Sequence, residues 1–266
     1  MKLKNIFNEK EKQIIPFITC GFPSKKESID VVNLLLDEGV KIIEIGIPFS
    51  DPTADGPTIQ YSSFVALKNN INIDDVFDVI EKTMNYKSYY PVIMTYLNPV
   101  LIYGREKFFK RAKEVGVSGV IFADCIVEEY GIFYFLAKKY NIANIPLLSS
   151  TTSKQRRNLI YKFCDGFIYL VTIRGVTGVR KDLPKYFYDL VRQVKKETSQ
   201  PVCVGFGIST PQQVLPVLKY IDGIIVGSSI INIIKEFSGK ERYKNLSNFI
   251  KTFQKISNFE RNSYEI

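Results

Sequence analysis

The chain has 266 residues, of which 45% are hydrophobic, and its 36 Lys and Arg against 27 Asp and Glu give a net charge of +9. The basic residues are mostly scattered pairs without interleaved aromatic residues, which argues against nucleic-acid binding. The longest apolar runs are too short to span a bilayer, and the N-terminal segment lacks the apolar stretch of a secretory signal. We therefore expect a protein of the cytoplasm or an organelle stroma, such as a plastid, that binds neither nucleic acid nor membrane.

The residue types that the chain lacks limit its chemistry. There is no His, which removes the commonest acid/base group and most transition-metal sites. The four cysteines share no metal-ligand spacing, and their apolar surroundings are typical of buried free thiols in a reducing compartment; they are Cys20, Cys125, Cys164 and Cys203. We expect no metal and no cofactor, so catalysis would depend on carboxylates, Tyr, Lys, Ser, Thr or the backbone.

Apolar runs typical of strands alternate with helical segments along the chain. After a short charged N-terminal helix, strands are predicted at 14–20, 41–46, 91–96, 119–124, 145–148, 166–170, 201–205 and 223–227. Helices are predicted to follow them, beginning near residues 24, 58, 74, 105, 128, 154, 184, 211 and 228, with residues 97–99 as a loop. Eight strand-then-helix units predict a parallel sheet.

In a chain of this length, eight such units predict an α/β fold: a single (β/α)₈ TIM barrel with an extra N-terminal helix, occupying residues 1–266 as one domain. The site of such a barrel lies at the carboxyl ends of its strands. A doubly wound open sheet is the structural alternative.

Residues 43–57, IEIGIPFSDPTADGP, are the segment around which the rest is organised. If 41–46 is a strand, Ile42, Glu44 and Gly46 share one face, and a lone Glu on an apolar strand is costly without a partner or a function. Glu44 is either an edge-strand carboxylate that reaches water or a buried acid with a raised pKa. Two more carboxylates, Asp51 and Asp55, lie in the following loop.

Glycine clusters follow the last two predicted strands, at 205–209 and 227–229, and the second opens a helix. Glycines let backbone N–H groups approach an anion, and a helix N-terminus attracts one. In barrels these two loops are the usual phosphate site, although tight turns after strands also favour Gly. Residues 175–178 could add donors to the same anion.

The chain resembles the α subunit of tryptophan synthase over nearly its whole length. The motifs that carry the resemblance are 44–52 (EIGIPFSDP), 54–60 (ADGPTIQ), 96–99 (YLNP), 167–171 (FIYLV), 175–178 (GVTG) and 205–209 (GFGIS). The resemblance implies a (β/α)₈ lyase that cleaves indole-3-glycerol phosphate to indole and glyceraldehyde 3-phosphate without a cofactor of its own. It also implies an α₂β₂ assembly with a β subunit that makes L-tryptophan from the indole and L-serine.

By resemblance, Glu44 and Asp55 are the two catalytic carboxylates and Tyr169 is the tyrosine near the acid. The remaining implied site residues are Gly178, Gly205, Gly207, Gly227 and Ser228 for the substrate phosphate, and Phe17, Met94, Ile121, Leu147, Thr177 and Phe206 for the indole pocket. The chain departs from the usual family residues at Thr53, Cys125-Ile126 and Ser149-Ser150, in loops on the active face, of which the first two match regions that dock the β subunit.

The residue types agree with a retro-aldol cleavage. No Lys lies near the carboxyl end of a predicted strand to form a Schiff base, and there is no His to bind zinc. Indole can accept the electrons itself if its C3 is protonated and its ring N–H is held by a base, which requires one acid and one base. Glu44, in an apolar setting, suits the protonated role, and Asp55, in a polar loop, suits the ionised role. The competing hypotheses are a catalytically weak interaction subunit and a barrel enzyme for another phosphorylated substrate.

Overall fold

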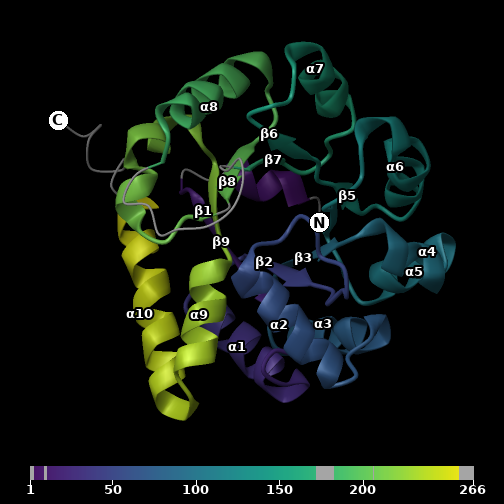
Figure 1. The fold of residues 1–266 in the computed structure, drawn as a ribbon, viewed down its shortest axis with the longest axis vertical. Coiled ribbons are helices and arrows are strands. Elements are labelled where there is room, and N and C mark those ends of the chain that lie inside the picture. Colours follow the sequence, from purple (N-terminus) through teal and green to yellow (C-terminus); the bar gives the residue numbers. More distant parts are fainter. Residues whose placement is uncertain (1–2, 9–10, 172–182, 206, 258–266) are drawn as a thin grey trace.

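The chain folds into a set of parallel strands surrounded by a ring of helices (Figure 1). The computed structural model describes residues 3–8, 11–171, 183–205 and 207–257. The strands are β1 (Gln13–Thr19), β2 (Ile42–Gly46), β3 (Tyr90–Thr95), β4 (Gly119–Phe122), β5 (Ala143–Asn144), β6 (Leu147–Ser149), β7 (Ile168–Val171), β8 (Val202–Gly205) and β9 (Gly223–Val226). Among the described residues, no helix is long and apolar enough to cross a membrane.

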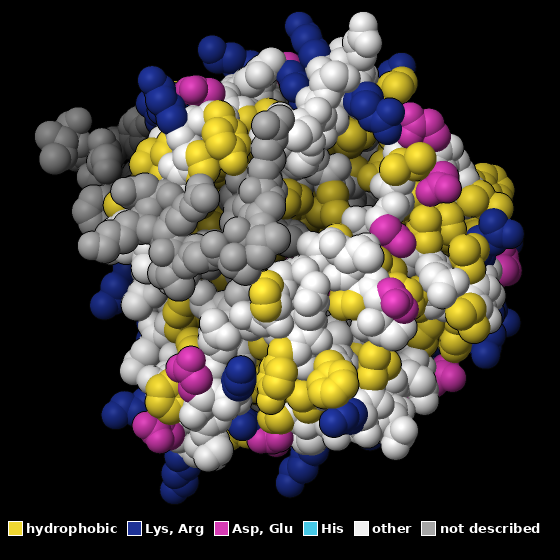
Figure 2. All heavy atoms as spheres, in the orientation of Figure 1, with side chains coloured by type: hydrophobic (Ala, Val, Ile, Leu, Met, Phe, Trp, Pro, Cys, Tyr) yellow, Lys and Arg dark blue, Asp and Glu magenta, His cyan; other side chains and the backbone are white. Residues whose placement is uncertain are grey.

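The helices cover the outer face of the strands. They are α1 (Lys25–Asp37), α2 (Pro57–Lys68), α3 (Ile73–Tyr86), α4 (Leu97–Tyr103), α5 (Arg105–Glu114), α6 (Tyr130–Lys139), α7 (Lys154–Lys162), α8 (Lys185–Glu197), α9 (Ser228–Glu236) and α10 (Gly239–Ser257). Short 3₁₀ segments complete the set, namely η1 (Leu3–Asn8), η2 (Val127–Glu129), η3 (Pro211–Gln213) and η4 (Leu215–Tyr220). On the face shown in Figure 2, Lys and Arg side chains are scattered around the edge.

The strands close into a barrel. Their order is β5-β4-β3-β2-β1-β9-β8-β7-β6, and the two end strands are consecutive in the chain, separated only by Ile145 and Pro146. Segment 143–149 bonds to β4 on one side, through the N–H of Ile145 to the carbonyl of Val120 at 3.0 Å, and to β7 on the other. It is therefore the fifth of eight barrel strands, and the predicted (β/α)₈ fold is confirmed.

The split of this fifth strand differs from the prediction of one continuous strand at 145–148. Pro146 has no N–H to donate, but its carbonyl accepts a 3.1 Å hydrogen bond from the N–H of Tyr169. The ladder is interrupted at the proline, while the closure of the barrel is kept.

Two other segments differ from their predictions. The helix predicted from residue 211 is a pair of 3₁₀ segments, η3 and η4, because Pro216 lies where an α-helix starting at Pro211 would have its interior, and proline breaks an α-helix there. The loop predicted at 97–99 is instead the first turn of α4, where Pro99 is tolerated. The N-cap of this helix, Tyr96, comes directly after β3.

The extra N-terminal helix is present as η1 and covers the amino-terminal end of the barrel. Leu3 and Ile6 are buried, and the ring of Phe7 packs edge-on against Phe167 with centroids 5.6 Å apart. A side chain on Gly119, the first residue of β4, would meet Leu3 at 3.1 Å. The amino end of the barrel is therefore packed, and the carboxyl end is left for a site. That residues 1–266 form one domain stays a prediction.

Candidate active site

The strand register places most of the predicted site residues on one face of the sheet. Directly paired residues of parallel strands point to the same side. Glu44 pairs with Phe17 and Val92, Gly46 with Met94, and Met94 with Ile121. On the other half of the barrel, Tyr169 pairs with Leu147 and Cys203. This shared face lines the interior of the barrel, because the helices cover the opposite face.

Glu44 is a carboxyl buried inside the barrel. Its exposed fraction is 0%, and neither carboxylate oxygen has a hydrogen-bond partner among the described residues. Burial raises the pKa of Glu44 from 4.5 to about 8, so the side chain is mostly protonated at neutral pH. The reading as an edge-strand carboxylate that reaches water is wrong for the described structure, since β2 lies between β1 and β3.

Asp55 lies in the loop between β2 and α2 and is held by a tyrosine. The hydroxyl of Tyr96 donates to Oδ2 of Asp55 at 3.0 Å and accepts from the N–H of Ala54 at 3.0 Å. Burial raises the pKa of Asp55 and the bond from Tyr96 partly offsets this rise. The resulting pKa is about 6, so the carboxyl is mostly ionised at pH 7. In the sequence, Tyr96 stands out only as part of the motif 96–99, although its place at the end of the predicted strand 91–96 is a signal for a site residue.

Tyr169, on β7, lies close enough to both carboxylates to interact with them electrostatically. The side chain is 3% exposed. Its pKa lies well above the usual value, chiefly through burial, with additional contributions from the charges of Glu44 and Asp55. A Cβ on Gly205 would come within 2.5 Å of the Tyr169 hydroxyl, so Gly205 makes room for this ring. Packing therefore gives a reason for the glycine that is independent of phosphate binding.

Phe17 and Met94 lie beside Asp55 at the carboxyl end of the barrel. Together with Asp55, Gly46 and Tyr96 they help to line a small cavity of about 10 Å³. A Cβ on Gly46 would come within 2.6 Å of the Phe17 ring, and one on Gly227 would contact Phe17 at 3.4 Å. Phe17 thus packs between the end of β2 and the start of α9.

Three of the predicted phosphate-binding residues, Gly207, Gly227 and Ser228, lie at or near the N-terminus of α9. Gly227 is the N-cap, without a side-chain capping bond, and Ser228 is the first residue of the helix. Ser229 donates to the carbonyl of Ile208 at 3.5 Å, so the turn after β8, in which Gly207 has a φ of +79°, lies against the first turn of α9. Thr177, Gly178 and Phe206 lie outside the described residues.

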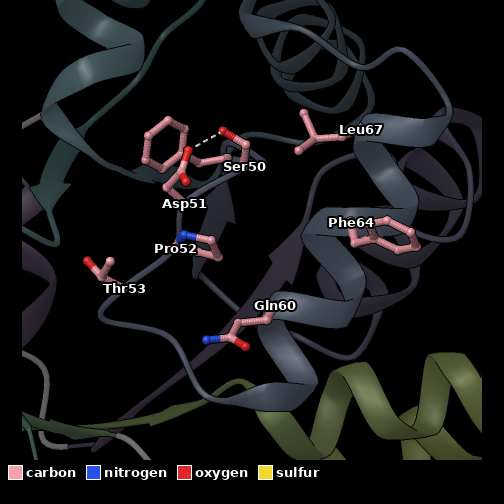
Figure 3. Close-up of a pocket in the computed structure, with 8 residues that line it drawn as sticks. Ser50, Asp51, Pro52, Thr53, Gln60, Phe64 and Leu67 are labelled. Atoms are coloured by element: carbon pink, nitrogen blue, oxygen red, sulfur yellow. Dashed lines mark hydrogen bonds between the residues drawn. The ribbon is translucent and has the colours of Figure 1, made fainter.

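The loop before α2 also borders a groove on the outside of the barrel. It has a volume of about 390 Å³ and is lined by residues of the loop and of α2. Figure 3 shows Asp51 and Thr53 on the loop side and Gln60, Phe64 and Leu67 on the helix side. Asp51 accepts a hydrogen bond from the hydroxyl of its neighbour Ser50, so it is not part of the buried acid–base pair.

This parallel barrel carries at one end a buried protonated carboxyl, an ionised carboxylate and an uncapped helix N-terminus, which defines a (β/α)₈ enzyme suited to acid–base chemistry on an anionic substrate. Among the described residues, no group of three or more Cys, Asp and Glu side chains could hold a metal ion. The profile of the tryptophan synthase alpha chain family matches residues 3–261, and the chain belongs to that family.

Named relatives agree with this assignment. The tryptophan synthase alpha chain of Thermoanaerobacter sp. (strain X514) is 39% identical over 257 residues, which are 96% of this chain and 97% of the relative. A chain of the tryptophan synthase α₂β₂ complex from Pyrococcus furiosus has a TM-score of 0.84 at 37% identity, covering 91% of this chain and 98% of that one. A chain of Mycobacterium tuberculosis tryptophan synthase has a TM-score of 0.85 at 29% identity, covering 93% of this chain and 96% of that one.

The family expected from the sequence and the lyase activity of that family are therefore confirmed. The roles of individual residues stay predictions. The described structure brings together Glu44, Asp55 and Tyr169, and it places the described phosphate-binding positions at the same end of the barrel.

Proposed function

We propose that this chain cleaves indole-3-glycerol phosphate by a retro-aldol reaction in which Glu44 is the acid and Asp55 the base. The observation that carries the proposal is the environment of Glu44, a fully buried carboxyl without a hydrogen-bond partner among the described residues, on the same barrel face as Phe17. Such a group keeps its proton at neutral pH because burial raises its pKa to about 8.

The protons balance with these two groups alone. Glu44 donates its proton to C3 of the indole ring, while Asp55 accepts a hydrogen bond from the ring N–H and stabilises the positive charge that forms there. The Glu44 carboxylate then takes the proton of the hydroxyl on the carbon attached to C3. The carbon–carbon bond breaks, its electrons return to the ring, and indole and the aldehyde leave with Glu44 protonated again.

The phosphate of the substrate is proposed to bind at the N-terminus of α9 and the turn after β8. The uncapped N–H groups that follow Gly227 suit an anion. Gly207 is proposed to contact the phosphate from the turn after β8 and Ser228 from the first turn of α9. Gly178 is proposed to provide a further contact. The indole is proposed to lie against Phe17, Met94, Ile121 and Leu147, together with Thr177 and Phe206.

A direct test measures indole release from indole-3-glycerol phosphate by the purified chain and by Glu44→Gln and Asp55→Asn variants. We expect each substitution to lower kcat by at least about 10²-fold, the scale of general acid–base catalysis, with smaller changes in substrate binding. Asp51→Asn is the matched control, because Asp51 lies in the same loop but is exposed, and it should retain near-normal turnover. Normal turnover in Glu44→Gln would refute the acid assignment.

The same assay separates the proposal from both competing hypotheses. A catalytically weak interaction subunit and a barrel enzyme for another phosphorylated compound would each release little or no indole from this substrate, and only the latter would turn over a different phosphorylated compound. We further propose that indole passes to a tryptophan synthase β subunit in an α₂β₂ assembly, as in the Pyrococcus furiosus complex. A place in the cytoplasm or an organelle stroma belongs to this proposal and agrees with four free cysteines.

A further inference from the structure

We infer that Tyr96 is a positioning residue for the reaction: its hydroxyl fixes the loop that carries Asp55 and directs one oxygen of that carboxylate toward the substrate. The inference rests on the proposed function, because it concerns the group assigned as the base. It adds a residue to which neither the sequence nor the resemblance gave a role.

The hydroxyl of Tyr96 makes two hydrogen bonds that together hold the loop. It accepts from the N–H of Ala54 and donates to Oδ2 of Asp55, both at 3.0 Å. A phenol has one proton to donate, and here the carboxylate receives it. Two consecutive loop residues are thus attached to one side-chain atom, which fixes the direction of the Asp55 side chain as well as the path of the loop.

Tyr96 is itself firmly held. It directly follows β3, it is the N-cap of α4, and its side chain is 4% exposed. The ring packs on Phe49 with centroids 5.1 Å apart. The next residue, Leu97, donates its N–H to Oδ1 of Asp124 at 2.9 Å. The hydroxyl that holds the base therefore projects from a fixed point of the barrel.

Within the part of the chain that the structure describes, no side chain donates a hydrogen bond to the other oxygen of Asp55, Oδ1. Among the described residues, Tyr96 is the only side chain that donates to this carboxylate, and the bond goes to Oδ2. Oδ1 is then the atom suited to accept the indole N–H. A carboxylate with one oxygen already bonded has fewer orientations to lose when substrate binds, which favours the transition state.

Among the described residues, few other titratable groups influence Asp55. Burial is the largest influence on its pKa and raises it, and the bond from Tyr96 acts in the opposite direction. Tyr169, across the barrel, interacts with both Asp55 and Glu44, and its own pKa lies well above the usual value. Removal of the Tyr96 hydroxyl takes away the bond that lowers the pKa of Asp55, while burial continues to raise it. The pKa of Asp55 should therefore rise above about 6.

The test compares Tyr96→Phe with the unchanged chain. Phe keeps the ring and its packing, and it removes only the hydroxyl. We expect kcat for indole release to fall by about tenfold with KM changed less than about twofold, since the lost bonds orient the base. When kcat is plotted against pH, the fall on the acidic side, where Asp55 becomes protonated, should move to higher pH. A purely structural role would lower stability without moving the acidic side of the profile.

Tyr89→Phe is the matched control. Tyr89 directly precedes β3, just as Tyr96 directly follows it, and it is 5% exposed. Its hydroxyl lies 2.9 Å from the hydroxyl of Thr83, within hydrogen-bond distance. This variant also loses a buried hydroxyl, but it should keep the kcat profile of the unchanged chain. An equal fall in kcat and an equal shift of the acidic side of the profile in both variants would overturn the inference.

Carboxyl-carbon NMR of the ¹³C-labelled chain measures the Asp55 titration without any catalysis. If Tyr96→Phe leaves that titration where it was, the positioning role is refuted, whatever the activity. If the titration moves upward but no variant or parent chain releases indole, the proposed function fails while the link between Tyr96 and Asp55 stands. The two conclusions can therefore fail separately.

Discussion

Glu44 is a residue whose burial costs stability. In the unfolded chain its pKa is near 4.3, whereas burial raises it to about 8 in the folded chain. Between these values the folded state holds a proton that the unfolded state has released. Stability therefore falls as pH rises from about 4.5 to 8, and the penalty is complete above 8. A carboxyl kept at this cost is typical of a functional site.

We therefore expect Glu44→Gln to become more stable relative to the unchanged chain as pH rises from 5 to 8. The relative gain should reach a few kcal/mol, since one pKa unit corresponds to about 1.4 kcal/mol. The neutral amide can lack a hydrogen-bond partner just as the acid does, but that cost is the same at every pH, so the pH dependence isolates the ionisation. Urea unfolding at several pH values measures it, and a difference independent of pH would contradict the burial of the acid.

The pH dependence of the reaction should reflect both carboxyls. Asp55 must be ionised, so kcat should fall as pH drops through about 6, and Glu44 must be protonated, so kcat should fall as pH rises through about 8. The profile is expected to be bell-shaped with a maximum near neutrality. Steady-state kinetics between pH 5 and 9 checks this, and a profile flat across that range would exclude these two groups as the acid and the base.

At the scale of single elements, local sequence signals predicted most strands and helices because each carried its own period and its own end signals. Ser24 caps α1 as expected by accepting the N–H of Glu27, and Gly39, at a φ of +82°, follows that helix. The errors at the fifth strand and at the helix predicted from residue 211 came from prolines inside predicted elements. Pro146 splits the fifth barrel strand and Pro216 prevents an α-helix, effects that hydrophobic periodicity does not report.

The candidate site was only partly predictable for a similar reason. Glu44 was found because one carboxylate in an apolar strand is unusual. Tyr96 was missed because its function depends on two hydrogen bonds to a loop 41 and 42 residues away in sequence. Gly205 was predicted for phosphate, yet the ring that fills its space belongs to Tyr169 on the neighbouring strand. Such contacts depend on the closed barrel and not on a local pattern.

The start of α9 gives a prediction at the scale of an element. A Cβ on Gly227 would meet Phe17 at 3.4 Å, an ordinary contact, so Gly227→Ala should fold normally. Gly227→Val adds two further methyl groups at the mouth of the barrel, where the phosphate is proposed to bind. We expect KM to rise in the order Gly, Ala, Val, with kcat changed less.

Saturation kinetics with indole-3-glycerol phosphate measures this order. Gly56→Ala is a suitable control, because Gly56 is also the N-cap of a helix, α2, and a Cβ there would meet nothing within 4 Å. An unchanged KM in Gly227→Val would place the phosphate elsewhere on the barrel.

At the scale of the whole molecule, closure of the barrel brings the acid and the base together from different kinds of structure. Glu44 is fixed in β2, inside the barrel wall, whereas Asp55 lies in a loop whose neighbours Thr53 and Ala54 are exposed. Loops at the mouths of barrels carry function and often move during turnover. The base therefore depends on the state of its loop, and a partner that contacts the loop can change the reaction rate.

A β subunit that binds the closed form of this loop should raise kcat by shifting its population. We expect slow turnover by the chain alone and at least about tenfold stimulation by the matching β subunit, which corresponds to about 1.4 kcal/mol of coupling. Thr53, on the exposed loop, and Ile126, which is 52% exposed, are both accessible to a partner. They should alter the coupling and leave the basal rate unchanged.

The experiment titrates β subunit into the unchanged chain and into Thr53→Leu and Ile126→Pro, which introduce the residues that the resemblance implies at these positions, and follows indole release. The expected result is an altered maximal stimulation or an altered half-saturating concentration of β subunit, with equal turnover in its absence. Asn85→Ala on α3, exposed and distant from the mouth, controls for a general surface change. If the two substitutions changed basal turnover and left stimulation untouched, these positions would act on the site itself, and the coupling would have to pass through other residues of the loop.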